Sequence, residues 1–281
     1  MRKQNPFSIY DFLGYLVPGS IVLYSLLIHK YLKTNEFFKI DEFINKMSSV
    51  KLDSLLLFII LSYIIGHLIN FISSVTIEKY ANWRYGYPSK YLLSIEIRGF
   101  WKSIDHWKEG IWRIGMIIIL LPIISLDLLF GKYLNFKQFY QKELDPLLRD
   151  LIVFKINKLF NKIGFDKVDN YKEFKNGKAN GYDFHRIVTH YAYENSKNHQ
   201  SKMSNYVALY GFLRSLSLIF NFISIYYFLR TLVYSSFNIK SILTLFILGL
   251  ISYTSFMAFM KFYRRYSLEG FMVIAIDPEL K

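Results

Sequence analysis

Four long apolar stretches constrain this chain most, and they stand in two pairs, one pair near each end. The first pair is predicted over Phe12–His29, with 18 residues, and Ser54–Ile77, with 24 residues. The second pair is predicted over Ser215–Val233, which contains Arg230, and Ser241–Met260. About 20 apolar residues in a helix cross the roughly 30 Å of hydrocarbon in a bilayer. We therefore expect an all-α integral membrane protein with four transmembrane helices.

A fifth apolar run, Ile114–Leu126, is treated differently because it has only 13 residues. Arg113 and Asp127 bound it, and Pro122 interrupts it. Runs of this length more often form re-entrant, interfacial or buried core helices than spans. We interpret the run as a membrane-skirting or core segment, with a fifth crossing as the alternative.

The distribution of positive charge predicts an orientation. Segment 78–213 carries 21 Lys and Arg against 13 Asp and Glu, a net charge of +8. Lys and Arg concentrate in cytoplasmic loops, and four crossings place this block and both termini together on that side. The five lysines of segment 30–51 oppose this orientation. We expect transmembrane units over 1–77 and 214–281, joined by a basic cytoplasmic helical domain over 78–213.

The middle block has mostly helical patterns. Apolar residues recur at helical spacing within Lys137–Gly164, and Gly164 is a typical helix stop. Lys172–Gly181 contains Asn-Gly twice and is expected to be a loop. Tyr182–Leu213 is predicted to form one long helix that leads into the third span.

Two predicted spans carry polar side chains at helical spacing, which places each set on one helix face. Inter-helix hydrogen bonding is the common use of such residues in membranes, and lining a wet path in an oligomer is the functional alternative. The pore-lining candidates are Tyr63, His67, Asn70 and Ser74 in the second span, and Ser217, Asn221, Ser224 and Thr231 in the third.

Lysines alternate with Tyr and Phe through segment 133–193. This composition suits stacking and phosphate contact with single-stranded nucleic acid, and it equally suits a helix that lies on a membrane. The candidates for binding an anionic ligand are Lys155, Lys158, Lys162, Lys172, Lys175, Lys178 and Arg186.

Residues that would indicate catalysis are scarce. The chain has no cysteine, which excludes disulfides, iron–sulfur clusters and Cys-ligated zinc. His190 and Glu194 share a helix face, and with His185 or His199 they form the one candidate enzymatic or metal site. A solvated helix surface explains the same residues. We expect no enzyme activity, catalytic residue, metal or cofactor.

Three segments resemble a known family. They are DFLGYLVPGSIVLYSLL (Asp11–Leu27), YPSKYLL (Tyr87–Leu93) and ALYGFLRSLSLIFNF (Ala208–Phe222). Together with the four-span plan, they resemble the membrane effector of Hailong-type bacterial antiphage defence. The apolar run Ile114–Leu126 has no place in that pattern.

The resemblance implies an oligomeric channel in the bacterial inner membrane. It implies control by an oligonucleotide that a partner nucleotidyltransferase makes, and membrane disruption that stops the infected cell. A non-conducting, membrane-anchored sensor or scaffold that docks a soluble partner enzyme is the alternative function.

Overall fold

A computed structural model describes residues 8–34, 39, 41, 42, 45, 51–96, 99–102, 104–164, 183–234 and 237–280. Within these residues all regular secondary structure is helical. Four helical stretches are long and apolar enough to cross a membrane: Ile9–Leu32, Leu52–Tyr91, His199–Val233 and Ile239–Ile276. The predicted all-α class with four apolar spans is therefore confirmed.

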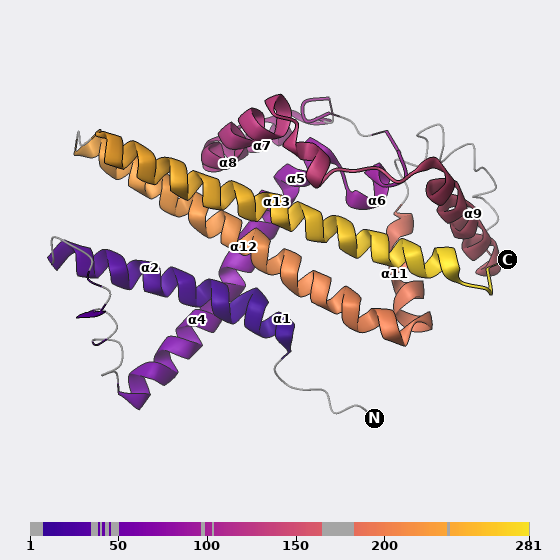
Figure 1. The fold of residues 1–281 in the computed structure, drawn as a ribbon, viewed down its shortest axis with the longest axis horizontal. Coiled ribbons are helices and arrows are strands. Elements are labelled where there is room, and N and C mark those ends of the chain that lie inside the picture. The colour runs from indigo at the N-terminus through magenta and orange to yellow at the C-terminus, as the bar shows by residue number, and fades with distance from the viewer. Residues whose placement is uncertain are drawn as a thin grey trace.

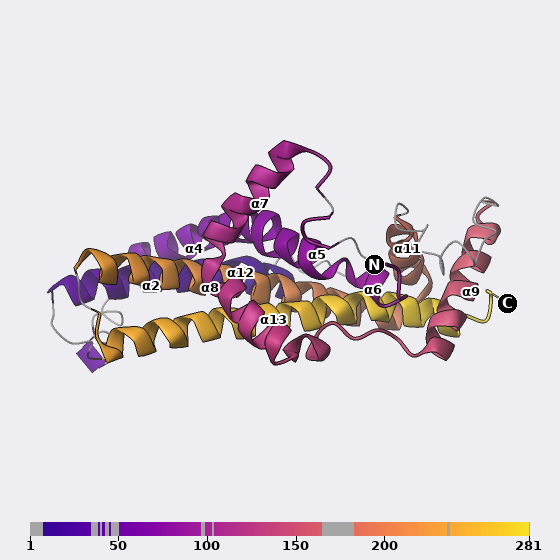
Figure 2. The ribbon, with the colours of Figure 1, turned by 90° about the horizontal axis from the view of Figure 1, so that it is seen from above.

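Two very long helices form the axis of the molecule. They are α12 (Lys197–Val233, 37 residues) and α13 (Ile239–Ile276, 38 residues), which lie side by side in opposite directions (Figures 1 and 2). At 1.5 Å per residue each is about 55 Å long, nearly twice the thickness of the hydrocarbon layer. Each is therefore long enough to continue well beyond the bilayer.

The N-terminal helices pack against this axis and cross each other closely. A Cβ on Gly19 would lie 1.7 Å from the Ser62 carbonyl oxygen, and one on Gly66 would lie 1.9 Å from that of Tyr15. Only glycine allows two membrane helices to approach so closely. The elements are α1 (Ile9–Asp11), the π-helix η1 (Phe12–Leu16), α2 (Val17–Thr34), α4 (Leu52–Ser73), the π-helix η2 (Ser74–Glu78) and α5 (Lys79–Tyr85).

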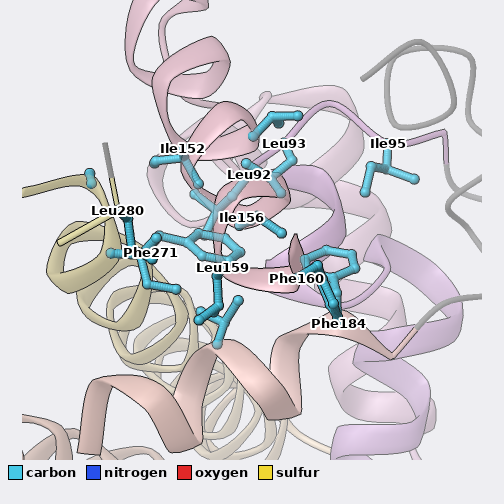
Figure 3. Packing of buried hydrophobic residues seen from close by; sticks show 14 of the residues in the cluster. Leu92, Leu93, Ile95, Ile152, Ile156, Leu159, Phe160, Phe184, Phe271 and Leu280 are labelled. Carbon is cyan, nitrogen blue, oxygen red and sulfur yellow. The ribbon is translucent and has the colours of Figure 1, made fainter. Parts of the chain in front are cut away.

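The middle of the chain forms shorter helices along α13, with α8 beside the first half of α13 and α9 and α11 beside its C-terminal end. One core gathers side chains from α6, α9, α11 and the end of α13, including Leu92, Ile156, Phe184 and Phe271 (Figure 3). The elements are α6 (Pro88–Tyr91), α7 (Trp107–Ile119), α8 (Leu121–Leu126), the π-helix η3 (Asp127–Tyr133), the 3-10 helix η4 (Phe136–Phe139), α9 (Pro146–Lys162) and α11 (Phe184–Asn195).

Two helix predictions need correction in detail. The single helix expected over Tyr182–Leu213 is wrong, because Ser196 has non-helical dihedral angles and separates α11 from α12. The break lets α11 fold back and bury Phe184 against α13. The helix within Lys137–Gly164 begins only at Pro146, and Gly164 ends it with a φ of 77°. The Lys172–Gly181 loop lies outside the described residues.

The exposed surface explains why the chain needs a bilayer. On α4, ten large apolar side chains are exposed, from Leu52 to Phe71. Soluble proteins rarely expose apolar patches of this extent. By helix length and hydropathy, the chain is a multi-pass membrane protein.

The ends of the helices are segregated along the molecule. The C-terminal end of α2 and the α12–α13 connection lie at one end, whereas α9, α11 and the C-terminus lie at the other (Figure 1). This arrangement fits four crossings with the middle block on one side. The predicted boundary between the middle domain and the second membrane unit, at 213/214, falls inside α12.

Candidate functional site

Two buried polar clusters lie where α12 and α13 pass the start of α5. The first, which we call the Arg214 cluster, joins α12 to α4 and η2. The Arg214 guanidinium donates to Ser73 Oγ at 3.1 Å and to Asn70 Oδ1 at 2.7 Å, and it forms an ion pair with Glu78. The Arg214 side chain is 8% exposed and that of Glu78 is 25% exposed. The cluster is therefore buried at Arg214 and partly open to its surroundings at Glu78.

The second cluster surrounds a fully buried carboxylate and is called the Asp127 cluster. Asp127 Oδ2 accepts from Tyr80 at 2.8 Å, and Oδ1 accepts from Tyr85 at 2.5 Å and Tyr140 at 3.1 Å. Arg84 lies 3.8 Å from Oδ2. Burial of a charge is costly unless hydrogen bonds compensate, and this carboxylate has three hydroxyl donors and one cation.

Local backbone structure makes room for the Asp127 cluster. Asp127 opens the π-helix η3, and Gly131 follows one turn later. A Cβ on Gly131 would lie 2.5 Å from Asp127 Oδ1 and 3.0 Å from the Tyr140 hydroxyl. Burial and the neighbouring carboxylate raise the pKa of Tyr140, so its hydroxyl stays protonated and can donate.

The first set of pore-lining candidates is engaged inside the chain to different degrees. His67 stacks on Tyr15 with ring centroids 3.6 Å apart, and Tyr63 packs edge-on against both rings. Asn70 belongs to the Arg214 cluster. Ser74 donates to the Phe71 carbonyl of its own helix. Of these four residues His67 is exposed, and the other three are partly buried.

The second set of candidates faces the packing between helices. Ser217 and Ser252 exchange hydrogen bonds across α12 and α13, each hydroxyl donating to the other residue's carbonyl, at 3.0 and 2.8 Å. Asn221 donates to the Ile119 carbonyl at 2.7 Å. Ser224 is buried beside a groove of about 270 Å³, and Thr231 donates to the Tyr227 carbonyl. Inter-helix packing accounts for most of this stripe.

Two of the four described ligand-binding candidates contact the chain's own C-terminal tail. On α9, Lys155 donates to the Asp277 carbonyl at 2.8 Å and Lys162 pairs with Glu279 at 2.7 Å. Lys158 lies over the Phe154 ring. Arg186, on α11, is 82% exposed and pairs with Asp183. Lys172, Lys175 and Lys178 lie outside the described residues.

The histidine site expected as an alternative is not assembled. Burial lowers the pKa of His185 to about 4, and its ring packs against Phe271. His190 and Glu194 are exposed, whereas His199 bonds Glu269 at 2.6 Å. Among the described residues, no group of three or more His, Asp or Glu is placed to hold a metal ion.

The Asp127 cluster was missed at the level of sequence. One signal was available, because Asp127 directly follows an apolar run and a charge in that position needs a partner. Its tyrosine partners lie up to 47 residues away along the chain, so no local pattern identifies them.

Comparison with known proteins adds no relative to this description. No protein-family model matches the chain, and neither a curated protein nor a solved structure does so.

Proposed function

We propose that this chain is a membrane effector that conducts ions as an oligomer when an anionic ligand binds its basic domain. The observation that carries the proposal is the continuity of α12 and α13 from the membrane into the domain. A helix transmits displacement along its axis, because its backbone is hydrogen-bonded throughout. A ligand that moves the far ends of these helices would therefore move their membrane halves.

The ligand site proposed is the face of α9 that now holds the C-terminal tail. Lys155 and Lys162 bind Asp277 and Glu279, directly after the end of α13. Tyr191 also donates to the Asp277 carboxylate at 2.6 Å, and burial and this carboxylate raise the Tyr191 pKa. A phosphate-rich ligand would compete with the tail for the same ammonium groups. Its binding would release the end of α13.

The Arg214 cluster is the proposed joint in the membrane half. Ionisable groups inside membrane helices are rare, costly and commonly functional. Here Arg214 holds α12 to α4 and η2 through four separate hydrogen bonds, one of them to the Glu78 carboxylate, which is 25% exposed. If Arg214 replaced these hydrogen bonds with bonds to other acceptors, α12 could shift against α4. Four helices per chain do not enclose a water-filled path alone, so several copies are required.

The resemblance described above extends this proposal to bacterial antiphage defence. In that case the ligand is an oligonucleotide from a partner nucleotidyltransferase, both termini are cytoplasmic, and conduction stops growth of the infected cell.

Ion flux from liposomes tests the proposal. Purified protein would be reconstituted in vesicles of mixed neutral and anionic lipids, and efflux measured with and without defined short oligonucleotides. We expect ligand-dependent efflux, and we expect the double variant Lys155→Gln with Lys162→Gln to lose that dependence, because it removes the two ammonium groups for which the tail and the ligand compete. Lys240→Gln, an exposed lysine at the opposite end of α13, is the matched control. Vesicles that stay ion-tight with every ligand would remove the proposal.

A specific observation favours a second function. Ser217, Asn221 and Thr231 are buried and bonded within one chain, as expected of a helix bundle that does not conduct. The alternative is therefore a membrane-anchored sensor or scaffold that docks a soluble enzyme. Co-purification of that enzyme from cells, unchanged by Asn221→Leu, together with ion-tight vesicles, would support this alternative.

A further inference from the structure

The apolar run between Arg113 and Asp127 folds into a bent pair of helices. Trp107–Ile119 and Leu121–Tyr133 each have 13 residues and meet at Leu120 with a bend of 83°. At 1.5 Å per residue each leg is about 20 Å long, shorter than the hydrocarbon layer. Figure 2 shows α7 leaving the body of the molecule and α8 at the base of the bend.

Both legs contact the same short helix, α5. On the first leg, the Arg113 guanidinium lies 4.7 Å from the centre of the Trp83 ring. On the second leg, Asp127 binds the hydroxyls of Tyr80 and Tyr85. Because α5 has only seven residues, about 10 Å, the two charges that bound the apolar run lie within about 10 Å of each other along α5. A segment that crossed the bilayer would separate them by its thickness.

The bend itself lies farther along the membrane helices. Asn221 binds the Ile119 carbonyl, seven residues beyond Arg214 on α12. Leu121, directly after the bend, lines a groove with Gly249 on α13. Gly249 is seven residues from Phe256, which packs on Tyr80. Seven helical residues correspond to about 10 Å. Both helices therefore place the bend about 10 Å deeper than α5.

The backbone at the bend is protected as membrane depth requires. Non-helical backbone is tolerated there only when protein buries it and satisfies its polar groups. Leu120 and Ile123 are fully buried, the Ile119 carbonyl accepts from Asn221, and Pro122 has no N–H group to satisfy.

The outer face of the first leg is apolar and uncovered. Ile111, Trp112, Ile114 and Ile118 are all exposed, and Ile118 is 65% exposed. Trp101 and Trp107, at the outer end, are exposed as well. Tryptophan collects at the boundary between lipid and water, and isoleucine below it. The occupant that fits this face is therefore lipid: head groups around the tryptophans and acyl chains around Ile114 and Ile118.

We infer that residues 107–133 form a wedge that enters one leaflet, on the side of the domain, and returns to the same side. The wedge dips about 10 Å below the level of α5, a depth typical of interfacial helices. This inference does not depend on conduction or on any ligand.

Single cysteines test the side on which the wedge ends, because the chain has no cysteine of its own. Lys108→Cys and Lys137→Cys place exposed thiols before and after the bend. A membrane-impermeant maleimide would be applied to vesicles of known orientation. We expect both to react from the side that labels Arg186→Cys, and neither from the side that labels Lys240→Cys. Labelling of Lys108→Cys and Lys137→Cys from opposite sides would show a broken span and overturn the wedge.

A spin label tests insertion separately from sidedness. Ile118→Cys would carry a nitroxide, and its collision rates with oxygen and with a water-soluble nickel chelate would be compared in liposomes. We expect oxygen to dominate at Ile118, as at Ile247→Cys on α13, and the chelate to dominate at Ile187→Cys on α11. Chelate access at Ile118 equal to that at Ile187 would mean that the wedge lies outside the bilayer.

Discussion

The Arg214 and Asp127 clusters hold buried charges at similar positions along α12 and α13, yet they are built differently. Asp127 is fully buried, and its three tyrosine partners come from α5 and from the segment after η4. Arg214 has all its partners on one continuous stretch, from Asn70 to Glu78, and Glu78 is partly exposed. The first cluster ties several elements together, whereas the second ties only one helix to another.

The difference teaches what each cluster is suited to do. Asp127 is fully buried and its three hydroxyl donors are buried too, although Arg84, 3.8 Å away, is 31% exposed. A buried charge whose hydrogen-bond donors are all enclosed has no alternative arrangement of low energy. A charge beside a partly exposed carboxylate retains water as a substitute partner, so its contacts exchange at lower cost. We interpret the Asp127 cluster as a fixed anchor of the wedge and the Arg214 cluster as a movable joint. The predictions below test this contrast, from the largest expected effect to the smallest.

Asp127→Ala is expected to destabilise the protein most, by about 3–5 kcal/mol. It leaves the hydroxyls of Tyr80, Tyr85 and Tyr140 without their shared acceptor inside the core. The free energy of unfolding would be measured in mixed micelles by titration with sodium dodecyl sulfate, followed by circular dichroism. A loss below about 1 kcal/mol would contradict the description of this cluster as an enclosed anchor.

Gly131→Ala is expected to cost about 1–3 kcal/mol, because the added methyl group would overlap the Asp127 carboxylate. Gly115→Ala is the matched control, since its Cβ would meet nothing within 4 Å on α7. There alanine should stabilise the helix by up to about 1 kcal/mol. Equal effects of the two substitutions in the same titration would show that the space around Asp127 is not restricted.

How far the sequence predicted this architecture depends on how local each signal was. The four spans were predictable, because contiguous residues carry the hydropathy of each. Gly164 as a helix stop was predictable for the same reason. The break at Ser196 was not, because packing of Phe184 against Phe271 decides it. The partners of Asp127 and Arg214 were not either, since contacts such as Asn70 to Arg214 span 144 residues.

The polar stripes show the same limit within one motif. Helical spacing correctly placed Ser217 and Asn221 on one face of their helix. Spacing alone does not tell which neighbour that face meets, and here it meets α13 and the bend of the wedge. The sequence therefore predicted the stripe but left its use open between packing and pore lining.

Arg214→Leu is expected to cost about 1–2 kcal/mol, less than Asp127→Ala, because membrane hydrogen bonds contribute modestly and Glu78 remains accessible to water. If Arg214 is a joint, this variant should also change ion efflux, by shifting the ligand concentration for half-maximal flux. Arg214→Lys keeps the charge but loses the planar group with its several donors. Its stability should therefore lie between that of the unmodified protein and that of Arg214→Leu. If Arg214→Leu lowered the free energy of unfolding as much as Asp127→Ala does, the two clusters would not differ as joint and anchor.

The smallest effect is expected from neutralising the outer half of the joint. Glu78→Gln keeps the shape and one acceptor oxygen for Arg214, and the site is partly exposed, so the loss should stay below about 1 kcal/mol. Asp127→Asn is the equivalent change in the anchor, where an amide group would face three hydroxyl donors in a closed space. It should cost at least about 1 kcal/mol more than Glu78→Gln, because burial leaves no water to compensate. Both variants would be compared in the same unfolding titration. If both variants lowered the free energy of unfolding equally, burial would not determine how much these two charges contribute to stability.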